Sequence, residues 1–573
     1  MKKIFASVVV SLIVFSGCDF SFGKDVSPEA ALPLDSQFVM TFDYSNGEQV
    51  KNVKKIIEML PDYGIKKIFE EDLFSAEKLK DSGISYEEDI LPILEGKWKV
   101  SFAIDFLKTG NSIVAAYIEE DSKMKDLIEK NKKANDFFYA NDGELFVFAL
   151  TQAEVDNAMK RVKDGNGFSS NENFKNVSKN SKENIGYMYL EMGKIVENLF
   201  SEVSDTEKYD SKTLQDLKSQ MVVMKDMYFE LFAEDDGFGF GGVSNLSDDK
   251  ALLAKYMPYF GEKLSLIDKI PLENPILYFE YPSIGKYIAS FITGFKVGSE
   301  GGEITEENPV DMQKDYDEFL ASVGGFAGIS AEEAKGVLES QFAFALGDNG
   351  EKYPTISLYF DVDEKYKNAA KKMVSSMDAY VDEVVKEFEG MIGAKGAFKK
   401  EVKVVNGGGV NKLYIDFSAV PDEMASSFGV VPGLDLKKTK IEIYYGLTGD
   451  NVLTVALYPD FNKAYGEKTI GENKDVKEFL KKVGENSSYL FFLSPEKLIN
   501  FLDTNYYKLA KDYGFLPAEY EDNYALIKST MQALKYFVGS NFMPQENKLL
   551  FDAFLEVQKV KVDDALEKVK EGK

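Results

Sequence analysis

Apolar and polar residues alternate with a period of two in many short segments of the chain. In residues 97–105, Trp98, Val100, Phe102 and Ile104 fall on one face, which predicts a half-buried antiparallel strand. Segments with the same pattern lie at residues 38–43, 112–118, 144–150, 187–191, 228–233, 341–346, 355–362, 413–417, 440–445, 451–457 and 549–555.

Two turn sequences and one long helix add to this pattern. Residues 141–143 (Asn-Asp-Gly) and 448–450 (Thr-Gly-Asp) have the composition of hairpin turns. Residues 366–391 have apolar side chains at helical spacing, which predicts an amphipathic helix facing the core. Its apolar stripe is Ala370, Met373, Met377, Val381, Val384, Phe388 and Met391. Hairpins beside helices predict an α+β fold with curved antiparallel meander sheets packed against amphipathic helices, not a doubly wound parallel sheet.

The sequence repeats itself, in the same order, in its two halves. Three pairs of segments match: residues 32–44 with 270–282, 84–88 with 329–333, and 183–200 with 485–502. This order predicts two homologous α+β halves, residues 32–263 and 264–573. The second half is longer, and its extra residues lie near 294–311 and 395–411, where we expect loops or extended hairpins.

The N-terminus has the plan of a lipoprotein signal peptide over residues 1–17. Two lysines precede an apolar run at residues 4–15 that is too short to span a bilayer, and Ser16-Gly17 precedes Cys18. This ending resembles the lipobox of bacterial lipoproteins, although Phe15 stands where leucine is usual. A signal peptide with an incidental cysteine is the alternative. We expect acyl chains such as palmitate on Cys18, a tether over residues 18–31, and a location outside the cytoplasm, in the periplasm or at the cell surface.

The composition excludes several kinds of chemistry. The 573 residues include no histidine, one cysteine, one tryptophan and a single arginine, Arg161. A chain without histidine cannot form a Ser-His-Asp or Cys-His pair or a histidine metal site. The formal net charge of −28 is unsuited to nucleic acid. Loss of Lys2 and Lys3 with the signal peptide brings it to −30, so we expect the acyl anchor, not the protein surface, to hold the chain at the membrane.

Leu32-Pro33-Leu34-Asp35-Ser36 lies between the lipoprotein signal and an alternating strand. This arrangement resembles an uncharacterised family of bacterial envelope lipoproteins, defined only as a domain of unknown function, whose mature N-terminus reads Leu-Pro-x-Asp-(Ser/Thr). The resemblance implies an extracytoplasmic location and a duplicated, strand-rich fold. It implies no catalytic residues, because none are assigned in that family.

Residues 237–242 (Gly-Phe-Gly-Phe-Gly-Gly) fit the G-x-G-x-x-G pattern of dinucleotide sites. The acidic residues 234–236 before them would repel a pyrophosphate, and no parallel βαβ unit is predicted around them. We interpret the glycines as a strand or hairpin where the backbone bends or is closely approached, and we expect no cofactor. Residues 407–409, three glycines, are interpreted as a loop tip.

Carboxylates are the plentiful chemical groups of this chain. Residues 361–364 and 234–236 could offer oxygen ligands to a cation, but they lack the spacing of a calcium loop, so we interpret both as solvated acidic loops and expect no metal site. Two carboxylates can hydrolyse a glycosidic bond, yet no pair stands out by an apolar setting.

The sequence therefore predicts a lipid-anchored binding or scaffold protein outside the cytoplasm, without catalytic activity. The alternative is a carrier or chaperone for a lipid or other apolar ligand, because the 44 Phe and 31 Tyr residues could line a cavity as well as fill a core. A hydrolase using two carboxylates is a third hypothesis. The partners predicted are the membrane, through Cys18, and an unidentified protein or apolar ligand.

Overall fold

The computed structural model divides the chain into two compact units. Unit 1 comprises Met1–Pro258 and Met543–Lys573, and unit 2 comprises Tyr259–Phe542. The residues that the structure describes are 27–60, 98–104, 112–118, 137–179, 181–203, 218–219, 223–256, 264–270, 272, 274–283, 285, 312–348, 350, 353–393, 395–405, 407–421, 440–457, 469–483, 487–507, 519–545 and 547–559. Cys18, the signal peptide and residues 84–88 and 294–311 lie outside them.

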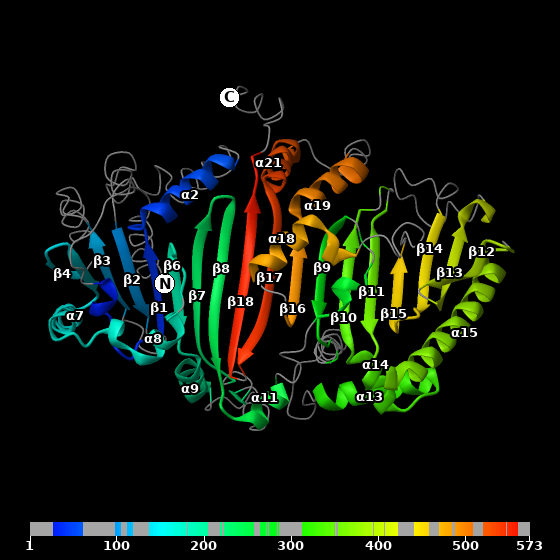
Figure 1. The fold of residues 1–573 in the computed structure, drawn as a ribbon, viewed down its shortest axis with the longest axis horizontal. Coiled ribbons are helices and arrows are strands. Elements are labelled where there is room, and N and C mark those ends of the chain that lie inside the picture. The colour runs from blue at the N-terminus through cyan, green and yellow to red at the C-terminus, as the bar shows by residue number, and fades with distance from the viewer. Residues whose placement is uncertain are drawn as a thin grey trace. The chain divides into compact units, whose positions relative to one another are not determined.

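Unit 1 contains an antiparallel sheet with the strand order β4-β5-β3-β2-β1-β6-β7-β8-β18 among its described residues (Figure 1). The strands are β1 (Phe38–Asp43), β2 (Trp98–Ile104), β3 (Ser112–Ile118), β4 (Phe138–Asp142), β5 (Leu145–Ala149), β6 (Gly186–Leu190), β7 (Met224–Glu234), β8 (Gly237–Leu246) and β18 (Lys548–Val557).

Unit 2 contains an antiparallel sheet with the order β12-β13-β14-β15-β11-β10-β9-β16-β17. The strands are β9 (Pro275–Tyr281), β10 (Gln341–Gly347), β11 (Thr355–Asp361), β12 (Phe398–Val405), β13 (Gly408–Asp416), β14 (Lys440–Leu447), β15 (Val452–Leu457), β16 (Tyr489–Leu493) and β17 (Leu534–Gln545). The order β4-β5-β3-β2-β1-β6-β7 of unit 1 has the same chain order as β14-β15-β11-β10-β9-β16-β17 of unit 2. Beyond this shared part, unit 1 has β8 and β18 next to β7, and unit 2 has the hairpin β12–β13 next to β14.

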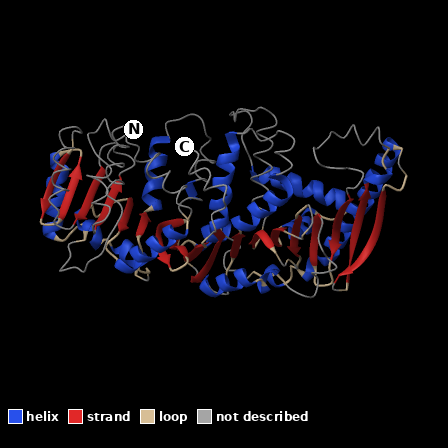
Figure 2. Ribbon diagram, turned by 90° about the horizontal axis from the view of Figure 1, so that it is seen from above, coloured by secondary structure: helices blue, strands red, loops and turns tan. Residues whose placement is uncertain are grey.

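Helices lie beside the strands, as Figure 2 shows. In unit 1 they are the 3-10 turns η1 (Pro28–Ala31) and η4 (Phe168–Ser170) and the helices α2 (Gly47–Met59), α7 (Gln152–Asp164), α8 (Glu172–Ser178), α9 (Met192–Val203) and α11 (Lys250–Tyr256). In unit 2 they are η5 (Leu266–Asp268), α13 (Met312–Ala327), α14 (Ala331–Leu338), η6 (Glu364–Tyr366), α15 (Lys367–Ile392), η7 (Phe417–Ala419), η9 (Ile470–Glu472), α18 (Lys474–Val483), α19 (Pro495–Leu502), the π-helical turn η10 (Asp503–Tyr507) and α21 (Glu519–Ala533).

Local sequence explains where several helices begin. The Asn46 side chain caps α2 by accepting from the backbone N–H groups of Glu48 and Gln49. Ser330 and Glu333 form a capping box at the start of α14. Each cap satisfies N–H groups that have no partner inside the helix, which fixes the helix start.

Each unit has a core between its sheet and its helices. In unit 1, Val39 of β1 and Tyr189 of β6 pack with Val155 of α7 and Phe168 of η4. In unit 2, Val337 of α14 packs with residues of α15 and of the strands. The α+β architecture and the antiparallel pairing agree with the sequence-based prediction.

The predicted strands and both predicted hairpins are present, with ends that differ by a few residues. The prediction for β2 was incomplete: Trp98 and Val100 are buried as expected, but Ser101 and Ala103 on the opposite face are buried as well. Both faces of β2 are covered here, so the strand is not half-buried. Trp98 itself is a core residue, stacked on Tyr44 with ring centres 5.2 Å apart.

The long predicted helix is α15, but its apolar stripe does not face the core throughout. Ala370 is buried, whereas the side chain of Val384 is 41% exposed and that of Met391 is 69% exposed. The helix is longer than the core that it covers. The expected extended hairpin near residues 395–411 is β12–β13, with Gly407 in its turn; Gly408 and Gly409 begin β13 and so are not loop residues.

The units differ from the predicted halves at the C-terminus. The boundary at Pro258 and Tyr259 lies close to the predicted one, but Met543–Lys573 belongs to unit 1 rather than to the second half. The reason is strand pairing, because β18 pairs with β8 along nine residue pairs from Lys548 to Glu556.

Candidate functional site

A 3-10 turn places a glutamate over the centre of the unit 1 sheet. Glu29 lies in η1, and its residue is 3% exposed. The turn is held from the side by Arg161 of α7, whose Nε donates to the carbonyl oxygen of Ala31 at 2.9 Å. The single arginine of the chain therefore supports the η1 turn, which the amino-acid composition does not indicate.

The Glu29 carboxylate meets three donors on one of its oxygens. The Tyr187 hydroxyl donates to Oε1 at 2.6 Å, the Thr41 hydroxyl at 3.3 Å, and the Lys99 Nζ lies 3.1 Å from the same atom. The other oxygen, Oε2, is buried and has no hydrogen-bond partner among the described residues. A buried carboxylate oxygen without a donor is costly, so this atom identifies a place where a donor group can be gained.

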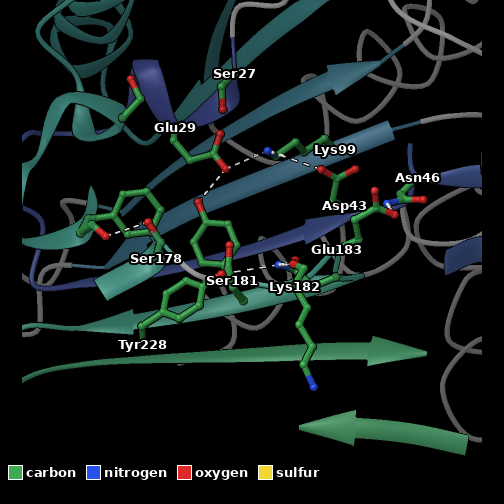
Figure 3. Close-up of a pocket in the computed structure, with 14 residues that line it drawn as sticks. Ser27, Glu29, Asp43, Asn46, Lys99, Ser178, Ser181, Lys182, Glu183 and Tyr228 are labelled. Carbon is green, nitrogen blue, oxygen red and sulfur yellow. Dashed lines mark hydrogen bonds and ion pairs between the residues drawn. The ribbon is translucent and has the colours of Figure 1, made fainter. Parts of the chain in front are cut away.

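Lys99 connects Glu29 to a second carboxylate. Its Nζ lies 3.4 Å from Asp43 Oδ2, and Figure 3 shows the amino group between the two acids. Burial by itself lowers the pKa of Lys99, but the charges and hydrogen bonds of Glu29 and Asp43 outweigh it and raise that pKa. The lysine is therefore held as an ammonium ion.

Three aromatic rings lie beside this charged group. The ring centres of Phe174 and Tyr187 are 5.3 Å apart, and those of Tyr187 and Tyr228 are 5.4 Å apart. Burial, followed by the Glu29 charge, raises the pKa of Tyr187 well above its usual value, and burial raises that of Tyr228. Both phenols therefore stay neutral, and Tyr187 keeps the proton that it donates to Glu29.

These residues line a pocket of about 380 Å³ in unit 1 (Figure 3). Its lining is Ser27, Glu29, Asp43, Asn46, Lys99, Ser169, Phe174, Ser178, Ser181, Lys182, Glu183, Asn184, Tyr187 and Tyr228. Most of these side chains are polar, and the three rings supply the apolar part. The volume is within the range of about 300–1,000 Å³ that is usual for small-molecule sites.

The pocket lies on a polar row that crosses the unit 1 sheet. Cross-strand pairing places Ser101, Thr41, Tyr187, Glu230, Gly241 and Asp552 side by side on β2, β1, β6, β7, β8 and β18. Ser101 and Thr41 are fully buried and share a hydrogen bond of 2.8 Å. Burial raises the pKa of Glu230 and of Asp552. A row with five polar residues, buried or partly buried, and Gly241 across six strands is a feature that no single strand reveals.

The glycine-rich segment forms the first part of β8, as interpreted from the sequence. Strand β8 pairs antiparallel with β7 and β18, so no parallel βαβ unit surrounds the segment. A Cβ atom at Gly239 would lie 2.1 Å from the Phe232 ring, and one at Gly242 would lie 1.8 Å from the Phe551 ring. The glycines leave room for rings of the neighbouring strands.

Neither acidic segment assembles into an ion site among the described residues. Asp361 is paired with Lys269 at 2.6 Å, Asp363 accepts from the backbone N–H of Lys365, and Asp235 is paired with Lys55 at 3.1 Å. No group of three or more acidic or cysteine side chains is placed to hold a metal in the part of the chain that the structure describes.

Unit 2 also has a buried glutamate beneath a 3-10 turn, but the glutamate comes from the strand. Glu280 of β9 accepts from the backbone N–H groups of η5 and the residue before it: Ser265 at 3.0 Å, Leu266 at 2.8 Å and Ile267 at 3.0 Å. The Tyr278 hydroxyl donates to it at 2.5 Å. Burial raises the pKa of Glu280 to about 7, against these hydrogen bonds. Both of its oxygens are satisfied.

Sequence reasoning did not single out Glu29, Lys99 or Tyr187. One signal was present: Lys99 and Ser101 occupy the polar phase of an alternating strand, the phase that a half-buried strand turns toward solvent. Cys18, the predicted lipidation site, lies outside the described residues, so the structure does not bear on it.

The site can be compared with what a hydrolase or a lipid carrier needs. Glu29 and Asp43 do not face each other across an open cleft, because the Lys99 amino group lies between them. The mostly polar lining of the pocket is unlike the apolar chamber that a lipid requires. The arrangement suits hydrogen bonding to a small polar molecule.

No family model and no curated protein matches this chain. Among solved structures, crystal forms III, I and IV of TP0453 are similar to parts of it, with 9%, 10% and 10% sequence identity. Their TM-scores are 0.22, 0.22 and 0.21, and they cover 42%, 41% and 40% of this chain and 90%, 88% and 85% of their own. At these TM-scores we draw no conclusion from the matches. No helix in the described part of the chain is long and apolar enough to cross a bilayer.

Proposed function

We propose that this chain is a lipid-anchored extracytoplasmic protein that binds a small polar molecule in the unit 1 pocket and does not chemically convert it. The observation that carries the proposal is the Glu29 carboxylate, which is buried in the wall of a polar pocket with one oxygen unpartnered. A ligand donor would complete its hydrogen bonding, as bound molecules do for buried polar groups in recognition sites.

The anchor is proposed on the sequence of residues 1–18, with acyl chains on Cys18. A Cys18→Ser variant should move from the membrane fraction to the soluble fraction of lysed cells. A variant that stays firmly in the membrane fraction would contradict the anchor, without bearing on the pocket.

We further propose that the two units are homologous and descend from one duplicated domain. The matching strand orders support this, as do the 3-10 turns before β1 and β9 and the helices that follow β6 and β16. The proposal explains why each unit has a turn over the same part of its sheet.

Ligand binding is tested by purifying the full chain in detergent and identifying co-purifying small molecules by mass spectrometry. We expect a polar molecule from the wild type and about ten-fold less of it from Glu29→Gln, because that change removes the charge that attracts the donor. Glu280→Gln is the matched control, since it alters an equally buried glutamate in unit 2. Equal recovery from wild type and Glu29→Gln would contradict the proposed site.

A further inference from the structure

If the unit 1 pocket binds a ligand as proposed above, its charges narrow the chemical class of that ligand. Three carboxylates line it, those of Glu29, Asp43 and Glu183. Two lysines line it as well, but the Lys182 amino group lies 4.2 Å from the centre of the Phe232 ring and points away from Glu29 in Figure 3. Lys99 is then the one ammonium group near three carboxylates in this lining, which leaves an excess of negative charge.

The unpartnered oxygen lies on the acid that is best shielded from water. The Glu29 side chain is 4% exposed, whereas that of Asp43 is 24% exposed. All three donors to Glu29 meet Oε1, so a donor to Oε2 would displace none of them. Because Oε2 is itself shielded from solvent, a side chain of the pocket wall must shift to admit that donor. In so buried a place a charged donor gains more than a neutral one, because water screens the interaction poorly.

The rings beside Glu29 fit the same kind of ligand. Phe174, Tyr187 and Tyr228 line the pocket and contact one another, with Phe174 and Tyr228 centres 6.1 Å apart. Aromatic rings attract cations to their faces and pack against the carbon skeleton that carries them. Carboxylates and rings together are the recognition chemistry of an organic cation.

We propose that the unit 1 pocket takes a small organic amine in its protonated form, with the ammonium group donating to Glu29 Oε2 and the carbon skeleton lying against the Tyr187 and Tyr228 rings. A neutral polyol would supply the donor but would leave the negative charge unbalanced. An anion would be repelled by the three carboxylates.

The test is calorimetric titration of the detergent-solubilised full chain at pH 7 with two matched pairs of probes. The pairs are putrescine with 1,4-butanediol and glucosamine with glucose, which differ by ammonium groups in place of hydroxyls. We expect at least one amine to bind about ten-fold or more tightly than its neutral partner, with a weakening of about ten-fold in Glu29→Gln. Glu183→Gln, at a more exposed lining carboxylate, should weaken binding about two- to three-fold. Glu280→Gln should bind as the wild type does.

The outcomes separate the ligand class from the binding function. Equal affinity within both probe pairs, or unchanged amine binding in Glu29→Gln with the folded fluorescence of Trp98 retained, would overturn the amine assignment. Binding of glucose or butanediol alone would overturn the amine assignment and leave the pocket as a binding site. Failure of all four probes, together with no co-purifying molecule, would overturn both proposals.

Discussion

The two units use a buried glutamate beneath a 3-10 turn in opposite ways. In unit 1 the acid belongs to the turn, and Glu29 reaches down to strand residues and leaves one oxygen unpartnered. In unit 2 the acid belongs to the strand, and Glu280 reaches up to three backbone N–H groups that occupy both of its oxygens. The comparison indicates that Glu280 closes its unit, whereas Glu29 keeps hydrogen-bonding capacity for a ligand.

The surroundings of the two acids follow the same division. In the row of paired residues under the unit 1 turn, Glu230, Tyr187 and Thr41 are polar neighbours. In the row that contains Glu280, the flanking residues are Ala343 and Leu490. Apolar direct neighbours favour a sealed structural contact, and polar direct neighbours favour a site.

Removing each carboxylate should give the largest difference between the units. Glu280→Ala should lower the unfolding free energy of unit 2 by about 4 kcal/mol, because it strands three N–H groups and the Tyr278 hydroxyl and leaves a cavity. Glu29→Ala should lower the unfolding free energy of unit 1 by about 2 kcal/mol. The loss is smaller because Thr41 keeps its hydrogen bond to Ser101 and Lys99 keeps its ion pair with Asp43. Hydrogen exchange in urea measures each unit, and Trp98 fluorescence reports unit 1. A larger loss for Glu29→Ala would reverse the assignment of roles.

Lowering the pH should stabilise unit 2 through protonation of Glu280. Burial raises its pKa from 4.5 to about 7, so the folded state binds the proton more tightly than the unfolded state does. This stabilisation is fully present below pH 4.5 and is lost as the pH rises through about 7. The total loss of unfolding free energy is about 3 kcal/mol. Between pH 4.5 and about pH 8, the unfolding free energy of unit 2 should therefore fall in the wild type. In Glu280→Gln it should not fall. If the same fall in unfolding free energy persists in Glu280→Gln, groups other than Glu280 cause it. Glu29→Gln is the control and should show the same fall as the wild type.

The glutamine pair sharpens the comparison because the shapes are unchanged. Glu280→Gln should lower the unfolding free energy of unit 2 by about 2 kcal/mol. Each carboxylate oxygen of Glu280 accepts from an N–H donor, so the NH₂ group of glutamine would point at a donor in either orientation. Glu29→Gln should cost unit 1 about 1 kcal/mol or less, because the NH₂ can occupy the unpartnered side. Equal costs would mean that Glu29 Oε2 has a partner in solution.

The smallest effect is expected from two buried threonines. Thr41→Val should cost about 1 kcal/mol, because the Thr41 hydroxyl bonds Glu29 and Ser101. Thr454→Val in unit 2 should be neutral or slightly stabilising, since the buried Thr454 hydroxyl has no hydrogen-bond partner among the residues that the structure describes. Chemical denaturation of both variants tests this, and a greater loss for Thr454→Val would contradict it.

The strands were accessible to sequence reasoning because alternation is a local property. Strands β1 and β3 begin and end at the predicted residues, and both predicted hairpins are present. The burial of Ser101 was missed because it depends on what covers the second face of β2, which strand periodicity does not encode. For the same reason the exposed end of α15 was predicted to face the core.

The candidate site was not accessible in this way. Glu29, Lys99 and Tyr187 are far apart in the chain and meet only because β1 pairs with β2 on one side and β6 on the other. A hint exists in unit 2, where Glu280 stands in the inward phase of a strand with Ile276 and Tyr278. A charged residue among inward-facing apolar residues indicates that the charge is buried. It does not indicate that the backbone N–H groups of a 3-10 turn will bond to it.

The sequence by itself determined many of the strand segments, the long helix α15, the antiparallel α+β class, the candidate anchor at Cys18 and the chemistry that a chain without histidine lacks. These depend on residue type and short-range spacing. Only the tertiary structure decided that β18 belongs to unit 1, that Arg161 holds η1, and that Glu29 keeps an unpartnered oxygen beside Lys99. The physical reason is that strand register and burial are long-range properties, set by which segments pack together rather than by any one of them.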